Sequence, residues 1–233
     1  MSITFLIPSY NSNTTLEDTV KEIIQAIKNT KYSDYEILIM DDCSTDQSSI
    51  TFRELQHKYQ NIKLHENLHN LGFCKNFLLG ISYASKEFLM FVPSDNVIDN
   101  MQITKIINKI NDNDMVIVNY SNQLRSRELS RFFISKIFTY AMNIFFINRI
   151  KYFNGTNIYR MSLLKNINIL SNSFIFQSEL VLKMLRLTRK YTYCSVKLNH
   201  IKNYEKKNTS FFVSKNIKKN IFDFIKLIGR KII

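Results

Sequence analysis

The sequence is poor in the residues that interrupt or staple a chain. Its 233 residues include four glycines and two prolines, so each of these marks a place with a special backbone demand. Its three cysteines, Cys43, Cys74 and Cys194, stand too far apart for a paired-cysteine metal site, and their odd number argues against a disulfide framework. We therefore expect a protein of a reducing compartment.

A long apolar run and a leader-like start are also lacking. The longest apolar stretch, residues 138–147, is well short of the roughly 18 residues that a spanning helix needs. The first residues show no basic segment ahead of an apolar one, so no signal peptide is expected. Hydrophobic residues make up 45% of the chain, enough to fill the core of one large folded domain.

Positive charge is in excess and unevenly distributed. The formal net charge of +13 admits nucleic acids, anionic membranes and phosphorylated ligands as partners. Residues 201–233 hold nine lysines and arginines against Glu205 and Asp223, a net charge of +7. More than half of the excess charge therefore belongs to the carboxyl-terminal segment.

Strand-like and helix-like segments alternate through the first 120 residues. The first expected helix has an apolar face from Val20 to Ile27 and a capping-box pattern, Thr14 with Glu17, at its start. The predicted strands are 3–7, 35–40, 62–66, 88–92 and 115–120, and the later helices are 51–59, 73–84 and 101–110. Such alternation is typical of parallel βαβ units, so we expect an α/β fold with a mostly parallel central sheet flanked by helices.

Polar residues follow three of the predicted strands, in segments 8–11, 41–46 and 93–96. In open α/β sheets the ligand lies beyond the carboxyl ends of the strands. Each segment alone is also typical of a turn or a helix cap, and for Ser44, Thr45 and Asp46 the two interpretations are evenly balanced. The convergence of three strand ends predicts a ligand site at one edge of the sheet.

The chain changes character after residue 120. A helix over 132–147 is apolar on both sides and is therefore expected to be buried or in lipid. A helix over 178–189 and a strand-rich segment over 191–200 come next. These segments predict further helical cover for the sheet and one more strand.

The carboxyl-terminal segment 215–233 is predicted to form an amphipathic helix. Its lysines face away from an apolar stripe made of Ile217, Ile221, Phe224, Ile225, Ile228 and Ile232. This pattern is typical of a helix that lies in a membrane interface. A helix docked on the protein's own core, with a solvated basic face, is the alternative.

Four short motifs occur in an order that resembles the family 2 glycosyltransferases. They are "IPSYN" at 7–11, "MDDCSTD" at 40–46, "NLGFCKNFLLG" at 70–80 and "VPSDN" at 92–96. Downstream, "YFNGTNIYR" and "FIFQSELVLKML" look like acceptor-side segments of the branch that includes the dolichyl- and undecaprenyl-phosphate sugar transferases. The resemblance covers about residues 1–212 and implies the GT-A nucleotide-sugar-binding fold.

The resemblance also implies roles for individual residues. The nucleotide would be held by Pro8, Tyr10, Asn11, Asp41, Asp42, Asn70 and Gly72. Asp95 would hold Mg²⁺ or Mn²⁺, which neutralises the diphosphate leaving group, and the catalytic carboxylates would be Asp95 and Glu179. The acceptor would lie against Arg125, Arg131, Asn154, Gly155 and Arg160.

Three positions depart from the family pattern. Pro93 stands where the first aspartate of the DXD motif is usual, so Asp41, Asp42 or Asn96 would have to compensate at the metal. Ser12 replaces a common glutamate. Thr156 and Asn157 stand where the lipid-phosphate branch often has Phe-Arg, so Arg125, Arg131 or Arg160 would have to supply the cation for an acceptor phosphate.

Two carboxylates keep a structural alternative. Asp95 would merely cap the helix that follows it, although Asp99 stands nearer to the start of that helix. Glu179 would stabilise the start of its helix electrostatically instead of orienting the acceptor side.

The sequence thus predicts a metal-dependent, inverting glycosyltransferase that uses a UDP- or GDP-linked sugar and a polyprenyl-phosphate or glycan acceptor. Residues 1–120 would form the nucleotide-sugar-binding half of one GT-A domain, 121–212 its acceptor-side half, and 213–233 a basic amphipathic tail helix. The protein would be cytoplasmic and peripheral at the inner face of an anionic membrane. A non-catalytic nucleotide-sugar binder is one alternative. A basic nucleic-acid-binding protein is another, but no nucleic-acid-binding motif is visible, so we expect no such partner.

Overall fold

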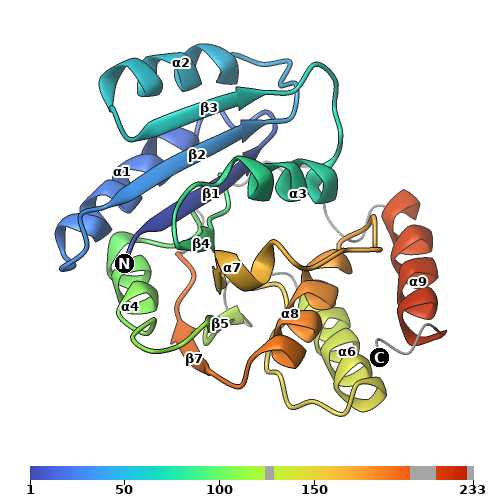
Figure 1. The fold of residues 1–233 in the computed structure, drawn as a ribbon. Coiled ribbons are helices and arrows are strands. Elements are labelled where there is room, and N and C mark those ends of the chain that lie inside the picture. Colours follow the sequence, from blue (N-terminus) through green and yellow to red (C-terminus); the bar gives the residue numbers. More distant parts are fainter. Residues whose placement is uncertain (124–128, 200–213, 230–233) are drawn as a thin grey trace.

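A seven-stranded sheet forms the centre of the molecule, as a computed structural model of residues 1–123, 129–199 and 214–229 shows (Figure 1). The strand order is β3-β2-β1-β4-β6-β5-β7. All neighbouring strands are parallel except β6, which is antiparallel to both β4 and β5. The prediction of an α/β fold with a mostly parallel sheet is confirmed.

The strands are β1 Ile3–Ser9, β2 Tyr35–Asp41, β3 Ile62–Glu66, β4 Phe88–Phe91, β5 Met115–Tyr120, β6 Ile158–Arg160 and β7 Tyr191–Val196. The helices are α1 Leu16–Lys28, α2 Ser48–Lys58, α3 Phe73–Tyr83, α4 Asn100–Ile107, α6 Leu129–Phe145, α7 Met161–Leu164, α8 Phe176–Leu187 and α9 Ser214–Gly229. Only β6 and α7 were not expected from the sequence. Both are too short to show a periodic pattern.

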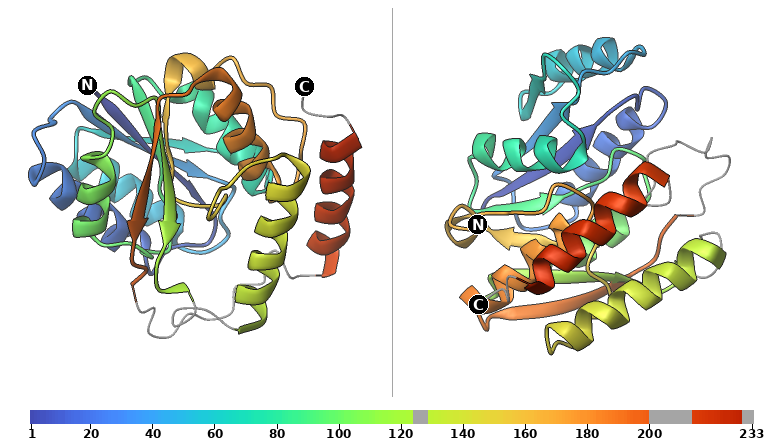
Figure 2. Two further views of the ribbon diagram at one scale, coloured as in Figure 1. Left: turned by 90° about the horizontal axis from the view of Figure 1, so that it is seen from below. Right: turned by 90° about the vertical axis from the view of Figure 1, so that its right-hand side faces the viewer.

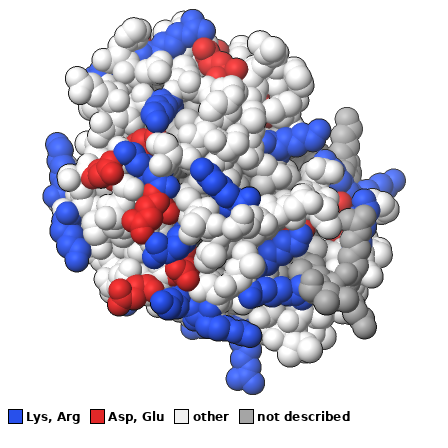
Figure 3. Space-filling view, viewed as in Figure 1, with Lys and Arg blue, Asp and Glu red and all other residues white. Residues whose placement is uncertain are grey.

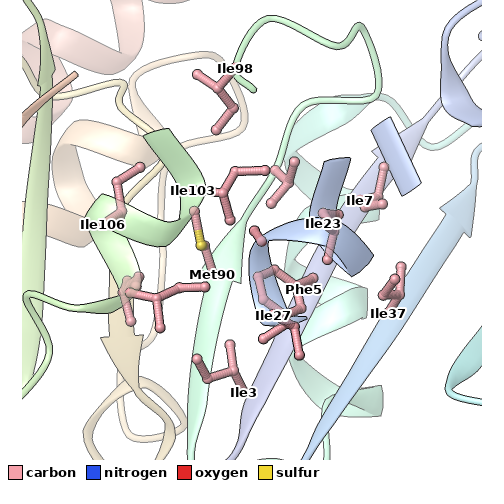
Figure 4. Close-up of a cluster of buried hydrophobic side chains, with 14 of the residues drawn as sticks. Ile3, Phe5, Ile7, Ile23, Ile27, Ile37, Met90, Ile98, Ile103 and Ile106 are labelled. Atoms are coloured by element: carbon pink, nitrogen blue, oxygen red, sulfur yellow. The ribbon is translucent and has the colours of Figure 1, made fainter. Parts of the chain in front are cut away.

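Two apolar layers cover the two faces of the sheet. Because successive side chains of a strand point to opposite faces, Ile3, Phe5 and Ile7 of β1 pack against α1 and α4 (Figure 4). Leu6, between them, faces the other layer, where α3 and α8 pack. A strand covered on both faces has no solvent side, which explains why all the residues of β1 and nearly all those of β2 are buried.

Two helix starts test the capping predictions. The capping box of Thr14 and Glu17 is wrong, because α1 begins one residue later with Thr15 as its N-cap. The Thr15 hydroxyl donates to the Ser94 carbonyl oxygen at 2.7 Å instead of capping its own helix. At α4, the Asp99 carboxylate accepts the Gln102 N–H at 2.9 Å, so Asp99 and not Asp95 is the cap.

The helices after β5 lie together on one side of the molecule (Figure 2). α6 buries Met142 completely but leaves its opposite side exposed, so of the two expectations complete burial is wrong, whereas contact with lipid stays a prediction. No helix in the described part of the chain combines the length and the apolar character that crossing a membrane requires. The three cysteines are free, as expected.

The tail helix α9 docks on the protein, in agreement with the alternative prediction, but by an unexpected side. Asn220, Asp223 and Leu227 are its buried residues, and the Asp223 carboxylate accepts the Asn172 N–H at 2.9 Å. Ile221 and Ile225, which belong to the predicted apolar stripe, point outward. Residues 214–229 form the helix that the amphipathic pattern predicts, but Ile221 and Ile225 of the predicted stripe are not on the docked side.

A buried glutamate ties the amino ends of the strands together. The Glu36 carboxylate in β2 accepts the Thr4 hydroxyl of β1 at 2.6 Å, the Lys63 ammonium of β3 at 2.7 Å, and the N–H and hydroxyl of Ser85, both at 2.7 Å. Burial alone would raise the pKa of Glu36, but the hydrogen bonds from Lys63, Thr4 and Ser85 outweigh burial and lower it to about 2. The charged Glu36 carboxylate therefore holds β1, β2, β3 and the segment before β4 together at the edge opposite to the predicted ligand site.

We predict that Glu36→Gln lowers the free energy of unfolding at pH 7 by about 1–3 kcal/mol. Because the folded-state pKa is depressed, this stability is present above the ordinary glutamate pKa and is lost as the pH falls toward 2. The variant should therefore show a flatter fall in stability between about pH 5 and 2 in urea titrations. The matched control is Glu54→Gln on the exposed side of α2; equal behaviour of the two variants would contradict the prediction.

Candidate active site

Three loops meet at the carboxyl edge of the sheet. Since β1 lies between β2 and β4, the segments that follow these strands are neighbours. They are 10–15 after β1, 42–47 after β2 and 92–99 after β4. The structure thus brings together the three polar segments that the sequence singled out.

Asn11 joins the β1 loop to the β2 loop. Its backbone has a φ of 50°, in the left-handed region that asparagine tolerates better than most residues. In this conformation its N–H donates to the Ser44 hydroxyl at 2.9 Å, and its side-chain oxygen accepts the Thr45 N–H at 2.8 Å. Neighbouring Tyr10 is 37% exposed, so its ring is available at the same edge.

Ser12 joins the β1 loop to the β4 loop. Its N–H donates to the Ser48 hydroxyl at 2.8 Å, and its own hydroxyl lies 2.8 Å from that of Ser94. Ser94 is held a second time, because its carbonyl oxygen accepts the Thr15 hydroxyl. The serine at position 12, a departure from the family pattern, is therefore a structural link to the segment that carries Asp95.

Asp41 is a buried carboxylate at the end of β2. It accepts the Ser44 hydroxyl at 2.5 Å and the Ser44 N–H at 3.2 Å. Burial raises the pKa of Asp41, and the hydrogen bonds from Ser44 offset only part of that rise. Asp46 accepts the Ser48 N–H at 2.9 Å, so only Asp46 of the Ser44, Thr45 and Asp46 group takes part in starting α2.

Asp42 organises the loop that leads into α3. It is 3% exposed, and its carboxylate accepts the N–H of Leu71 at 2.7 Å and of Gly72 at 2.8 Å. The side chain of Asn70 donates to the Asp42 carbonyl oxygen at 3.1 Å. Gly72 has a φ of 79° and a ψ of 157°, a backbone region essentially reserved for glycine. Asp42, Asn70 and Gly72 therefore form one rigid wall of the site.

The Asp95 segment is fixed on both sides. The N–H of Asn96 donates to the Thr19 hydroxyl at 3.0 Å, and its carbonyl oxygen accepts the Asn199 side chain at 3.1 Å. Asn96 has a φ of 50°, and its side-chain oxygen is buried without a hydrogen-bond partner. Asp95 itself is partly exposed. A buried unpaired oxygen beside a carboxylate costs free energy, and such a group is explained by a function or a bound ion.

The oxygens at this edge are suited to a divalent cation that also takes ligands from outside the protein. No group of three or more His, Cys, Asp or Glu side chains in the described residues is arranged to hold a metal. Asp95 and the unpaired oxygen of Asn96 are hard oxygen donors, as Mg²⁺ and Mn²⁺ require. Such ions usually keep several non-protein ligands and are held by one or two carboxylates together with substrate phosphates.

The predicted acceptor residues separate into two groups. Asn154 and Gly155 lie at the carboxyl edge, because antiparallel β6 begins there: the Phe91 N–H donates to the Asn157 carbonyl oxygen. A Cβ on Gly155 would lie 2.2 Å from the Val118 carbonyl oxygen, so only glycine fits there. The Ser178 hydroxyl lies 3.4 Å from the Asn154 side-chain oxygen.

Of the predicted arginines, Arg160 is the one whose side chain the structure describes, and it does not lie at this edge. Arg160 ends β6 at the opposite edge, where its guanidinium donates to Asp114 at 2.6 Å and to Glu87 at 2.7 Å. That position does not fit the predicted contact with an acceptor phosphate, because β6 carries Arg160 away from the site. Arg131 belongs to α6, but its side chain, like the whole of Arg125, lies outside the described residues.

Glu179 is completely buried in the first turn of α8. It accepts the N–H groups of Leu170 and Ser171 at 3.0 and 2.9 Å and pairs with Lys183 at 2.6 Å. Burial would raise its pKa, but these hydrogen bonds lower it below the ordinary value. This carboxylate lies in the first turn of its helix, as the structural alternative supposes, and its hydrogen bonds hold the segment that leads into α8.

Sequence reasoning missed the residues that support the site from below. Asn67 donates to the Asp42 carboxylate at 3.0 Å and to the Asn76 side-chain oxygen at 2.9 Å, and Asn76 donates to the Met40 carbonyl oxygen at 2.8 Å. Both asparagines are buried. The second asparagine of "NLGFCKNFLLG", at position 76, was a usable signal, since a polar residue inside an apolar helix face usually has a buried partner.

Comparison with known proteins gives the chain a family. Residues 4–174 match the model of the family described as Glycosyl transferase family 2. A dolichyl-phosphate beta-glucosyltransferase of Trichomonas vaginalis is 25% identical over 156 residues, which are 62% of this chain and 47% of that protein. A poly(ribitol-phosphate) beta-glucosyltransferase of Bacillus spizizenii is 32% identical over 124 residues, 50% of this chain and 19% of that protein. The matches thus span less than half of either relative.

Solved structures show the same fold. TarS 1-349 of S. aureus in complex with UDP-GlcNAc has a TM-score of 0.64 at 21% identity, over 98% of this chain and 65% of that one. Glucosyl-3-phosphoglycerate synthase of Mycobacterium tuberculosis in complex with UDP has a TM-score of 0.70 at 12% identity, over 95% and 79%. At these identities the likeness is one of fold.

We predict that Asp42→Ala lowers the free energy of unfolding by about 2–4 kcal/mol, because it leaves the N–H groups of Leu71 and Gly72 without their acceptor. Urea unfolding measures this loss. The control Asp46→Ala removes a carboxylate that accepts one N–H near the start of α2, and it should cost no more than about 1 kcal/mol. A fully stable Asp42→Ala variant would show that the wall of the site forms without it.

Proposed function

The chain belongs to glycosyl transferase family 2 and has the GT-A fold, and on that premise we propose that it transfers a sugar from a nucleotide-linked donor to a lipid-linked or glycan acceptor. The observation that carries the proposal is the hydrogen-bonded union of three strand-end loops around Asn11 and Ser12. Solved complexes of proteins with this fold contain UDP or UDP-GlcNAc, which supports a UDP-linked donor.

The nucleotide would lie between the β1 loop and the wall formed by Asp42, Asn70 and Gly72. Tyr10 is the exposed aromatic residue of the β1 loop and would contact the base, and Asn70 is exposed on the opposite side. Pro8 fixes the exit of β1, and Asn11 and Asp41 hold the β2 loop in shape. Direct contact of the Asp42 carboxylate with the nucleotide stays a prediction, since three protein donors already use it.

A divalent ion at Asp95 and Asn96 would neutralise the charge that develops on the diphosphate as it leaves. Support for Mn²⁺ or Mg²⁺ comes from a structure of the same fold, glucosyl-3-phosphoglycerate synthase with Mn²⁺ and UDP. Two hydrogen bonds fix the backbone of Asn96 and would hold the side-chain oxygens of Asp95 and Asn96 in place. Asn96 would thereby replace the metal ligand that an aspartate at position 93 provides in the family pattern.

In the transfer, an acceptor oxygen bonds to the anomeric carbon from the side opposite to the leaving diphosphate, so the configuration inverts. A hydroxyl acceptor needs a base to take its proton, whereas a lipid phosphate is already ionised. Asp99 is bonded to its own helix and Glu179 to the segment before α8. Because both carboxylates are already hydrogen-bonded within the protein, a lipid phosphate is favoured as the acceptor. The relative named a dolichyl-phosphate beta-glucosyltransferase supports that choice.

A lipid-linked acceptor would bring the protein to a membrane surface, and we propose that it works there as a peripheral protein, at the inner face. A relative named for a diphosphoundecaprenol acceptor, 30% identical over 95 residues, supports this placement.

We predict that UDP-sugar raises the melting temperature of the protein only when Mn²⁺ or Mg²⁺ is present, and that UDP is then released in the presence of a polyprenyl phosphate. Asp95→Asn should reduce metal-dependent UDP release by at least about 100-fold without lowering the melting temperature of the free protein. Thermal-shift titrations of UDP- and GDP-sugars and an assay of released nucleotide measure both effects.

The matched control is Asp112→Asn, in an exposed loop between α4 and β5. An unchanged rate in Asp95→Asn would contradict the metal role. Binding of the UDP-sugar without release of nucleotide to any acceptor would favour the non-catalytic binder instead.

A further inference from the structure

Helices α6 and α9 lie side by side, and each exposes several apolar side chains. The ring of Phe224 in α9 contacts those of Phe138 and Phe145 in α6, with centroids 6.1 and 5.7 Å apart. Phe145 is itself 55% exposed, so the apolar contact between the helices continues to the outside. Figure 2 shows the two helices next to each other on one side of the molecule.

Helix α9 buries two polar residues and exposes apolar ones, which is the reverse of the usual pattern for a helix that packs on a core. Its buried side carries Asn220 and Asp223 together with Leu227, and neither polar atom of the Asn220 side chain has a hydrogen-bond partner. Its exposed side carries Ile221, Phe222 and Ile225, which are 55–62% exposed. A helix that served only to cover a core would bury the isoleucines and expose the amide. The outward side is therefore the one that needs a partner.

The exposed side of α6 continues the same surface. Ile137, Tyr140 and Ile144 are 67%, 70% and 55% exposed and stand three and four residues apart, so they form one stripe along the helix. We call these three residues, together with Ile221, Phe222 and Ile225 of α9, the α6/α9 surface. Six exposed apolar side chains on two neighbouring helices differ from the single exposed apolar residues that most proteins carry.

Both helices expose lysines, and neither exposes an acidic side chain. Lys136 of α6 and Lys218, Lys219 and Lys226 of α9 are exposed. Within the ranges 129–145 and 214–229, the only acidic residue is Asp223, which is buried. In Figure 3 lysine and arginine side chains also lie on the part of the molecule over α8. Exposed apolar side chains with lysines on the same two helices match a bilayer that contains anionic lipids.

We propose that the α6/α9 surface is the face by which this protein binds an anionic lipid bilayer. A second copy is a poorer occupant, because a symmetric contact would set the lysines of one copy near those of the other. Figure 1 shows the arrows of β2 and β3 pointing toward the side on which α9 lies, so α9 and the carboxyl ends of these strands are on the same side of the molecule. The choice of a lipid partner rests in part on the proposed function, but binding is measured without turnover.

The test is co-sedimentation of the full chain with vesicles of phosphatidylcholine, with and without phosphatidylglycerol. The expected result is binding to the anionic vesicles that weakens as salt is added. The double variants Ile137→Glu/Ile144→Glu and Ile221→Glu/Ile225→Glu should each weaken binding by at least about tenfold. The control Ile50→Glu/Met101→Glu changes two exposed apolar residues on α2 and α4 and should bind like the unmodified protein.

Circular dichroism and thermal melting establish that each variant is folded. If an isoleucine variant does not fold, Lys218→Glu/Lys226→Glu replaces it, because both lysines are exposed, and binding to anionic vesicles should again fall. Equal binding of all variants, equal binding to neutral vesicles, or a dimer in solution that does not sediment would each overturn the proposal. Loss of nucleotide release with intact vesicle binding would instead count against the proposed function alone.

Discussion

The Asn11–Ser12 pair is the connection on which the site depends. Two adjacent residues at the end of the central strand β1 bond to both neighbouring loops, one through Asn11 to Ser44 and Thr45, the other through Ser12 to Ser94. The left-handed backbone of Asn11 turns the chain so that both sets of bonds form at once. This pair joins all three loops, and the bond from Thr15 to Ser94 reinforces the connection, whereas the parallel strands themselves bond to each other only along their length.

The two edges of the sheet are built for different tasks. At the amino edge the Glu36 carboxylate satisfies donors from β1, β3 and the segment before β4, and nearly all its capacity is used inside the protein. At the carboxyl edge Asp41 and Asp42 are used in the same way, but Tyr10 and Asn70 stay exposed and an oxygen of Asn96 stays unpaired. Unused polar capacity thus concentrates where strand direction places the ligand.

Much of the fold followed from the sequence because local patterns and the global arrangement agree. The alternation of strands and helices predicted the parallel sheet, and the polar strand ends predicted which edge holds the site. The partners of several polar residues could not be predicted: the Thr15 hydroxyl bonds to Ser94 and does not cap its own helix, and Arg160 is the last residue of the three-residue strand β6, which places it at the far edge. In both cases a contact over more than 70 residues of chain overrode a local rule. The buried side of α9 was likewise set by tertiary contacts.

The antiparallel strand β6 restricts how substrates enter. It hydrogen-bonds to β4, which leads to Asp95, and to β5, while Asn154 and Gly155 lie in the segment just before it. The segment that carries Asp95 and the segment that carries Asn154 and Gly155 therefore adjoin neighbouring strands of a single sheet, roughly one strand spacing or about 4.8 Å apart. A sheet of this kind does not open like two domains joined by a hinge. Access to the reaction centre must come from movement of loops over a rigid floor, so the rate of substrate entry and product release should depend on the segments above the sheet and not on the sheet itself.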